Sequence, residues 1–183
     1  MKILRIHLTP VWSVWPILIA LLVPASSHAA APAALAPLDF LLGEWTAIAS
    51  GRPGEPSGGF TFSLGLQDHV LLRTNYSVSP GDSVRPATRH DDLMVIHPSL
   101  ASPLAADYYD SEGHVIRYTV QSPAAGQVVF LSDAAAAGPR FRLSYLLKPD
   151  GTLQGAFEIA PPGQPEAFQP YLSWMARKVG SAH

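Results

Sequence analysis

The sequence of 183 residues contains no cysteine. Disulfide bonds and a cysteine nucleophile are therefore excluded, and so is a lipid attached through an N-terminal cysteine. The sequence also lacks a nucleophile elbow and a phosphate-binding loop. A fold with none of these aids must be held together by side-chain packing and backbone hydrogen bonds alone.

Charge is sparse as well. Charged residues make up 14% of the chain, with 12 basic and 14 acidic side chains and a formal net charge of −2. Proteins that bind nucleic acids usually carry clusters of Lys and Arg, and the sequence contains no such cluster. We therefore expect no nucleic-acid partner.

The first 29 residues have the pattern of a secretory signal peptide. Lys2 and Arg5 precede an apolar stretch over residues 17–23, and small residues up to Ala29 complete a cleavage site. Prolines on both sides leave this stretch shorter than the about 20 residues of a membrane-spanning helix. A membrane anchor is the weaker alternative, and we expect no stable anchor after processing.

The expected address is therefore the periplasm or the exterior of a bacterium, since the bias toward Ala, Pro and Arg is typical of GC-rich bacterial genomes. Residues 30–37 are small residues and prolines without a period, which predicts a linker. Residues 38–180 are expected to form one domain. We expect it to be a monomer or a weak homodimer.

After a helical turn at residues 38–42, the hydrophobic pattern has a period of two, which is typical of strands. Ten strands are predicted, at residues 44–50, 59–66, 70–78, 91–97, 103–109, 114–122, 127–132, 139–147, 153–160 and 168–178. Turns such as 110–113 and 149–152 are too short for parallel crossovers, so neighbours should pair antiparallel. Closure would remove the two exposed edges, which favours an all-β, up-and-down antiparallel barrel over a sandwich.

The stretch Gly43-Glu44-Trp45, directly after the helical turn, resembles the first strand of lipocalin-type (calycin) barrels. The resemblance implies that Trp45 packs across the closed end of the barrel and that an Arg from the last strand, here Arg177, lies against it. The segments 91–98, 108–120 and 157–168 also resemble a bacterial family of exported, uncharacterised lipocalin-like proteins. The Thr-Asp-Tyr motif of true lipocalins is missing.

The apolar parity of each strand predicts which side chains face the interior. On this parity the lumen receives several polar-tipped groups, which would give a small-molecule site its hydrogen-bonding handles: His114, Tyr118, Tyr76, Tyr108, Tyr145 and Trp174. The alternative is a solid core in which the tyrosines reach the rim or each other. His114 could equally cap the turn through Asp110 or Glu112.

Three arginines, Arg73, Arg117 and Arg142, fall on the opposite parity and are expected on the solvent face. In ten-stranded fatty-acid-binding barrels, by contrast, inward arginines hold a carboxylate. If the parity is inverted here, these three become an anion site.

We expect neither a metal nor a cofactor. The stretches His90-Asp91-Asp92 and Asp110 to His114 offer possible ligands but have no recognised metal spacing. Ten-stranded nitrobindin-like barrels bind haem through a histidine near the C-terminus, and the predicted last strand has none.

The sequence therefore predicts an exported barrel that binds a small, apolar or amphipathic molecule in an internal cavity. No catalytic residue is assigned. An isomerase or lyase using His114 with a tyrosine is one alternative, and a filled barrel that acts through its surface is another.

Overall fold

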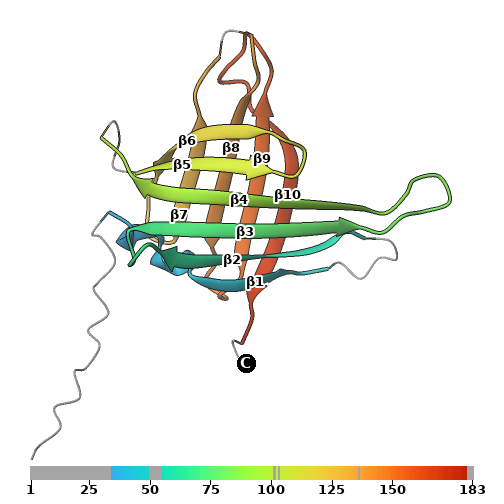
Figure 1. The fold of residues 1–183 in the computed structure, drawn as a ribbon, viewed down its shortest axis with the longest axis horizontal. Coiled ribbons are helices and arrows are strands. Elements are labelled where there is room, and N and C mark those ends of the chain that lie inside the picture. Colours follow the sequence, from blue (N-terminus) through green and yellow to red (C-terminus); the bar gives the residue numbers. More distant parts are fainter. Residues whose placement is uncertain (1–33, 50–54, 101, 103, 136, 181–183) are drawn as a thin grey trace, which may run out of the picture.

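Ten antiparallel strands close into a barrel in the computed structural model, among the residues it describes: 34–49, 55–100, 102, 104–135 and 137–180. Each strand pairs with its sequence neighbours, and the first strand pairs with the last (Figure 1). The all-β, up-and-down barrel predicted from the sequence is confirmed. The predicted signal peptide, residues 1–29, lies outside the described residues.

The strands follow the predicted order closely. They are β1 (Gly43–Ala47), β2 (Ser57–Gly65), β3 (Val70–Ser79), β4 (Thr88–Pro98), β5 (Leu104–Asp110), β6 (Val115–Gln121), β7 (Gln127–Ser132), β8 (Arg140–Leu147), β9 (Leu153–Ala160) and β10 (Gln169–Lys178). A 3-10 helix, η1 (Ala36–Leu41), precedes them and starts two residues earlier than the predicted turn. In the described part of the chain no helix is long and apolar enough to cross a membrane.

The 3-10 helix closes one end of the barrel. Leu35, Leu38 and Leu41 are at most 1% exposed, and the Trp45 indole N–H donates a 2.7 Å hydrogen bond to the Leu41 carbonyl. Trp45 itself is 2% exposed. The η1 ribbon lies beside the turn between β2 and β3, and we call this the closed end.

The partner of Trp45 differs from the expectation. The ammonium nitrogen of Lys178 lies 5.7 Å from the centre of the Trp45 ring, whereas Arg177 is exposed. Lys178 shares inward parity with Trp174 and the buried Ala176, so the strand alternation points Arg177 outward. Gly43, with φ at +110°, leaves room for Lys178, because a Cβ there would lie 2.6 Å from the lysine Cε. The predicted role of Arg177 is wrong, and Lys178 occupies that place.

The β3–β4 hairpin, the β5–β6 turn and the β9–β10 connection lie at the opposite end, which we call the open end. Toward the middle of the barrel the interior is filled with aromatic rings. Tyr145 contacts Phe60, Phe62, Phe130 and Trp174 with ring centres 5.7 to 6.4 Å apart. These rings fill the middle of the barrel between the closed end and the open end.

The predicted parity is right for the inner faces of β6, β8 and β9 but wrong for β3. Leu71 and Arg73 are 1% and 5% exposed, while Tyr76 is 43% exposed. The β3 sequence alternates apolar residues on one parity with Leu71, Arg73 and Asn75 on the other. Here the longer apolar series faces out, because β3 pairs with β2 and β4 in a register that turns Arg73 toward the buried Asp92.

Candidate functional site at the open end

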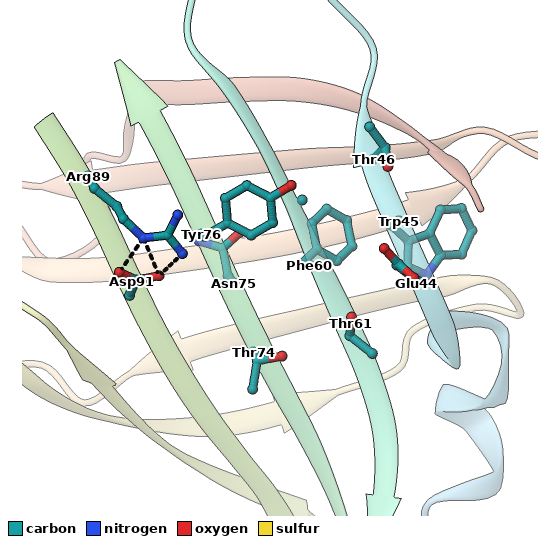
Figure 2. Close-up of a pocket in the computed structure, with 11 residues that line it drawn as sticks. Glu44, Trp45, Thr46, Phe60, Thr61, Thr74, Asn75, Tyr76, Arg89 and Asp91 are labelled. Carbon is teal, nitrogen blue, oxygen red and sulfur yellow. Dashed lines mark hydrogen bonds and ion pairs between the residues drawn. The ribbon is translucent and has the colours of Figure 1, made fainter. Parts of the chain in front are cut away.

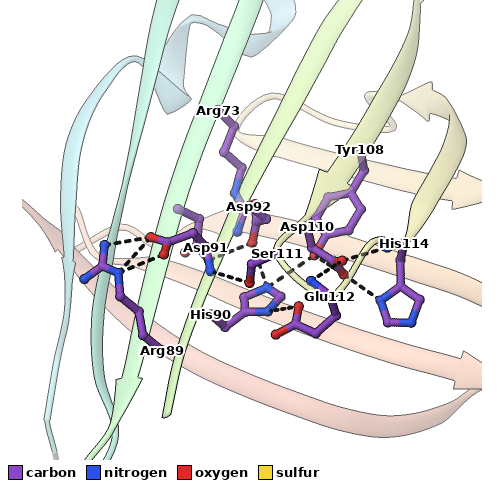
Figure 3. Close-up of polar contacts among 11 residues, drawn as sticks. Arg73, Arg89, His90, Asp91, Asp92, Tyr108, Asp110, Ser111, Glu112 and His114 are labelled. Atoms are coloured by element: carbon purple, nitrogen blue, oxygen red, sulfur yellow. Dashed lines mark hydrogen bonds and ion pairs between the residues drawn. The ribbon is translucent and has the colours of Figure 1, made fainter.

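Strand register brings an acidic and basic group of side chains together inside the open end. Asp92 on β4 lies directly opposite Asp110 on β5, and Asn75 on β3 lies opposite Asp92 on its other side. Two carboxylates facing each other across strands repel, so each needs its own compensation. Figure 3 shows how the surrounding side chains supply it.

Asp92 is compensated by a buried ion pair. Arg73 Nη1 lies 2.6 Å from Asp92 Oδ1, and the two side chains are 6% and 4% exposed. The Asn75 amide donates a second bond, 2.7 Å long, to Asp92 Oδ2. The Arg73 guanidinium also lies 5.8 Å from the centre of the Phe60 ring and 6.0 Å from that of Tyr145, so aromatic faces surround the charge.

Two buried polar atoms in this region have no hydrogen-bond partner among the described residues: Arg73 Nε and the Tyr145 hydroxyl. Burial raises the pKa of Tyr145 to about 12, although the positive charge of Arg73 and, to a smaller extent, a poorly aligned side-chain hydrogen bond with Arg73 act in the opposite direction. The phenol therefore stays protonated and can donate a hydrogen bond. An orphaned buried polar group is rare in proteins and calls for a partner such as a ligand or an ordered water.

Two further tyrosines line the same interior. Tyr118 is 3% exposed and Tyr108 is half-buried, and their rings meet edge to face with centres 6.5 Å apart. Burial raises the pKa of both phenols, and the negative charge of Asp92 raises it further. They act as neutral hydrogen-bonding groups.

At the rim of the open end, outside the buried Arg73–Asp92 ion pair, His90 links β4 to the β5–β6 turn. Its Nδ1 lies 2.7 Å from Glu112, and its Nε2 lies 3.3 Å from Asp92 and 3.4 Å from the Tyr108 hydroxyl. Because the β4–β5 register aligns these residues, a single imidazole connects the buried ion pair with the exposed turn.

Asp110 is the centre of the β5–β6 turn. Its Oδ1 accepts the backbone N–H groups of Glu112 and His114, and its Oδ2 lies 2.8 Å from His114 Nδ1. Burial opposes ionisation of this carboxyl, but these hydrogen bonds together with the nearby His114 lower its pKa overall. The His114 side chain is 68% exposed. It caps the turn and does not point into the lumen, so the placement expected for His114 is wrong, while the capping alternative is right.

The inner wall of the open end is apolar on its other side. Five inward-facing side chains from five different strands are only partly buried: Tyr108, Ile116, Phe141, Phe157 and Trp174. Phe141 and Phe157 stack with ring centres 5.9 Å apart. The Trp174 ring lies over Gly155, where a Cβ would come within 2.2 Å of it.

A separate pocket of about 250 Å³ lies along β1 to β4 (Figure 2). Most of its lining side chains have the outward parity of their strands, including Thr61, Thr74 and Tyr76. Arg89 lies 5.1 Å from the centre of the Tyr76 ring and pairs with Asp91 at 2.6 Å. Tyr76 thus belongs to the outer wall, and its predicted place in the lumen is wrong.

A second pocket of about 510 Å³ lies at the closed end, where Pro37 and Phe40 of η1 meet the β6–β7 turn. Neither of these two pockets lies inside the barrel. The internal cavity expected from the sequence is not supported by them, because aromatic rings occupy the middle of the lumen.

The three candidate arginines are not brought together. Arg73 is inside, whereas the Arg117 side chain is 84% exposed and Arg142 pairs with Glu158 on the outer wall at 2.6 Å. An anion site built from all three is therefore wrong. Tyr108, Tyr118, Tyr145 and Trp174 do lie together on the inner face, as their strand parity predicts.

Sequence reasoning missed Asn75 and the inward direction of Asp92. The available signal was the charge complementarity of Arg73, Asn75 and Asp92, which strand register makes neighbours on one face. Comparison with protein-family models and with curated protein sequences finds no match. The class of protein defined by the fold is therefore a closed, ten-stranded antiparallel barrel with one plugged end and one polar, partly open end.

Proposed function

We propose that the protein binds a small, largely apolar molecule at the open end of the barrel, with an uncharged oxygen of that molecule directed toward Tyr145 and Arg73. The observation that carries this proposal is a pair of neighbouring buried polar atoms, Arg73 Nε and the Tyr145 hydroxyl, neither of which has a well-aligned hydrogen-bond partner among the described residues. One ligand oxygen can accept from both donors. Leaving both donors unsatisfied costs about 1–3 kcal/mol for each group, which a ligand would recover.

The apolar part of the ligand is matched by the partly buried inward side chains of the open end. Phe141, Phe157 and Trp174 expose ring surface that a closed core would have covered. Apolar walls with a few convergent polar groups are the usual composition of small-molecule sites.

The local charges favour a neutral ligand over an anion. Arg73 is already paired with Asp92, and the rim adds the carboxylates of Asp110 and Glu112. A ligand carboxylate would meet an interior that is neutral and a rim that is acidic. This distinguishes the site from the arginine-based anion sites of fatty-acid-binding barrels.

Export, and the resemblance of Gly43-Glu44-Trp45 to the first strand of lipocalin-type barrels, would both fit this proposal. The sequence pattern of residues 1–29 supports a secreted or periplasmic protein. The plug of η1 and Trp45 at one end leaves the other end as the approach route for a ligand.

Native mass spectrometry of the exported protein tests the proposal. We expect a non-covalent adduct on the wild-type protein that is lost in Tyr145→Phe, which keeps the ring and removes only the hydroxyl. Tyr76→Phe is the matched control, since it removes a hydroxyl from the outer wall and should leave the adduct in place. An adduct that disappears in Tyr76→Phe and persists in Tyr145→Phe would favour the outer-wall pocket instead, and with it a protein that acts through its surface.

A further inference from the structure

We propose that the rim of the open end holds a divalent transition-metal ion, of the zinc class, between His90, Asp110 and Glu112. One potential ligand atom of each residue lies within 4.8 Å of those of the other two. His90 is near the start of β4, Asp110 ends β5, and Glu112 lies in the β5–β6 turn. Figure 3 shows the three side chains converging from these elements.

The distances require only small adjustments. Zinc binds histidine nitrogen and carboxylate oxygen at about 2.0–2.2 Å, which places neighbouring ligand atoms about 3.3–3.6 Å apart in a tetrahedron. His90 Nδ1 and Glu112 are 2.7 Å apart and would separate slightly around an ion, whereas no pair of ligand atoms starts more than 4.8 Å apart. The Glu112 side chain is 48% exposed on a turn, so it is free to adjust around an ion.

The imidazole is oriented by groups that are not part of the cluster. His90 Nε2 lies 3.3 Å from Asp92, a carboxylate that is 4% exposed and is held by Arg73 and Asn75. In metal sites the ring nitrogen that does not bind the ion usually donates to such a carboxylate, which fixes the ring and increases its basicity. This leaves Nδ1, on the side of Glu112, for the ion.

Asp110 is oriented in the same manner. Its Oδ1 accepts two backbone N–H groups of the β5–β6 turn, at 3.1 and 2.8 Å, so the carboxylate has a fixed direction before any ion binds. Two ligands therefore lie on or at the end of paired strands, and the third, Glu112, is a half-exposed side chain on the turn.

The choice of metal follows from the ligands. One imidazole and two carboxylates suit zinc or manganese, whereas calcium prefers six to eight oxygens and Cu(I) prefers sulfur. The two carboxylates carry two negative charges, which a divalent ion balances. Water would complete the coordination on the solvent side.

Isothermal titration of the tag-free full chain with zinc chloride tests the proposal. We expect one equivalent to bind, and we expect His90→Gln and Glu112→Gln each to weaken binding by at least about 10- to 100-fold, because each removes a ligand and that range already applies to the loss of an outer-shell partner. The structure offers a matched control in His97, which lies on the outer face of β4 and faces one carboxylate, Asp107, at 3.4 Å without a third ligand. His97→Gln should change the affinity by less than about 2-fold.

Three results would overturn the site: the absence of zinc binding, an equal loss of affinity in His97→Gln and His90→Gln, or binding of calcium as tightly as zinc. Circular dichroism of each variant before titration separates loss of the site from loss of the fold. The test does not depend on the organic ligand proposed above, since it uses the metal alone.

Discussion

The two ends of the barrel differ in how completely their side chains are buried and hydrogen-bonded. At the closed end, η1 and Trp45 bury leucine and indole surface almost completely, and the one indole N–H has a partner at 2.7 Å. At the open end, hydrophobic side chains stay partly exposed, and a buried ion pair lies beside two polar atoms without partners. Among the described residues, both buried side-chain polar atoms that lack a well-aligned partner, Arg73 Nε and the Tyr145 hydroxyl, lie toward the open end.

The closed end has the features that stabilise a fold, whereas the open end has the features of a binding site. Apolar burial of the kind seen around Trp45 contributes about 25 cal/mol per Å² and has no further requirement. Partly exposed rings and orphaned donors lower stability, so their presence at one end is informative. It marks the end of the barrel at which a ligand can supply the hydrogen bonds and apolar contacts that the protein itself does not make.

The largest effect is expected at the closed end. Trp45→Ala should lower the free energy of unfolding by about 3–5 kcal/mol, because it removes a large buried aromatic side chain and leaves a cavity under η1. Chemical denaturation monitored by circular dichroism measures this. Trp45→Phe should cost clearly less, and a midpoint that Trp45→Ala hardly moves would mean that η1 and Trp45 do not hold this end together.

Breaking the buried Arg73–Asp92 ion pair at the open end should also lower the free energy of unfolding strongly. Unlike the loss of Trp45, this effect should be largely reversed by a second substitution. Arg73→Met should destabilise by about 3–5 kcal/mol, because it leaves Asp92 buried without its counter-charge. The double variant Arg73→Met/Asp92→Leu should recover most of this loss, since a well-fitting apolar pair is often as stable as a buried ion pair. A double variant that is as unstable as the sum of the two single changes would show that the charges are not coupled.

A second arginine–carboxylate pair, on the outer wall, should contribute much less to stability. Arg142 and Glu158 lie 2.6 Å apart with side chains 35% and 22% exposed, and Arg142 also lies 4.1 Å from the centre of the Phe168 ring. Arg142→Gln should cost about 0.2–1 kcal/mol, as for other ion pairs open to solvent.

The same pair sets a small pH dependence. The hydrogen bond from Arg142 lowers the pKa of Glu158 below its ordinary value of 4.5. A carboxyl with a lowered folded-state pKa stabilises the fold fully above pH 4.5, and this contribution is lost as the pH falls through the folded-state value. Denaturation midpoints should fall less steeply below pH 4.5 in Arg142→Gln than in the wild type, and equal slopes would exclude the pair as a source of acid sensitivity.

Strand order and closure could be predicted from the sequence because both follow from local signals. Period-two patterning gave strand positions, and short turns with Gly113 and Gly151, at φ of +89° and +78°, required antiparallel neighbours. The place of Trp45 at the closed end was implied by the resemblance of Gly43-Glu44-Trp45 to the first strand of lipocalin-type barrels.

The composition of the open end could be predicted only in part. Tyr108, Tyr118 and Tyr145 follow from parity because each lies in a strand with one apolar series. Both parities of β3 carry apolar residues, so hydrophobicity alone favoured the wrong face and hid Arg73. The burial of Arg73 depends on Asp92, 19 residues away, and such long-range pairing is not visible in a local period.

The Tyr145→Phe variant shows whether the open end of the barrel binds a ligand through the Tyr145 hydroxyl. In ligand-free protein the Tyr145 hydroxyl has no well-aligned hydrogen-bond partner, so its removal should leave the free energy of unfolding unchanged or raise it by up to about 1–3 kcal/mol, while the adduct in native mass spectra is lost. Denaturation of the ligand-free protein and mass spectrometry of the exported protein measure the two quantities. A variant that is less stable than wild type by more than about 1 kcal/mol, or that retains the wild-type adduct, would contradict the account, because the hydroxyl would then serve the fold and not a ligand.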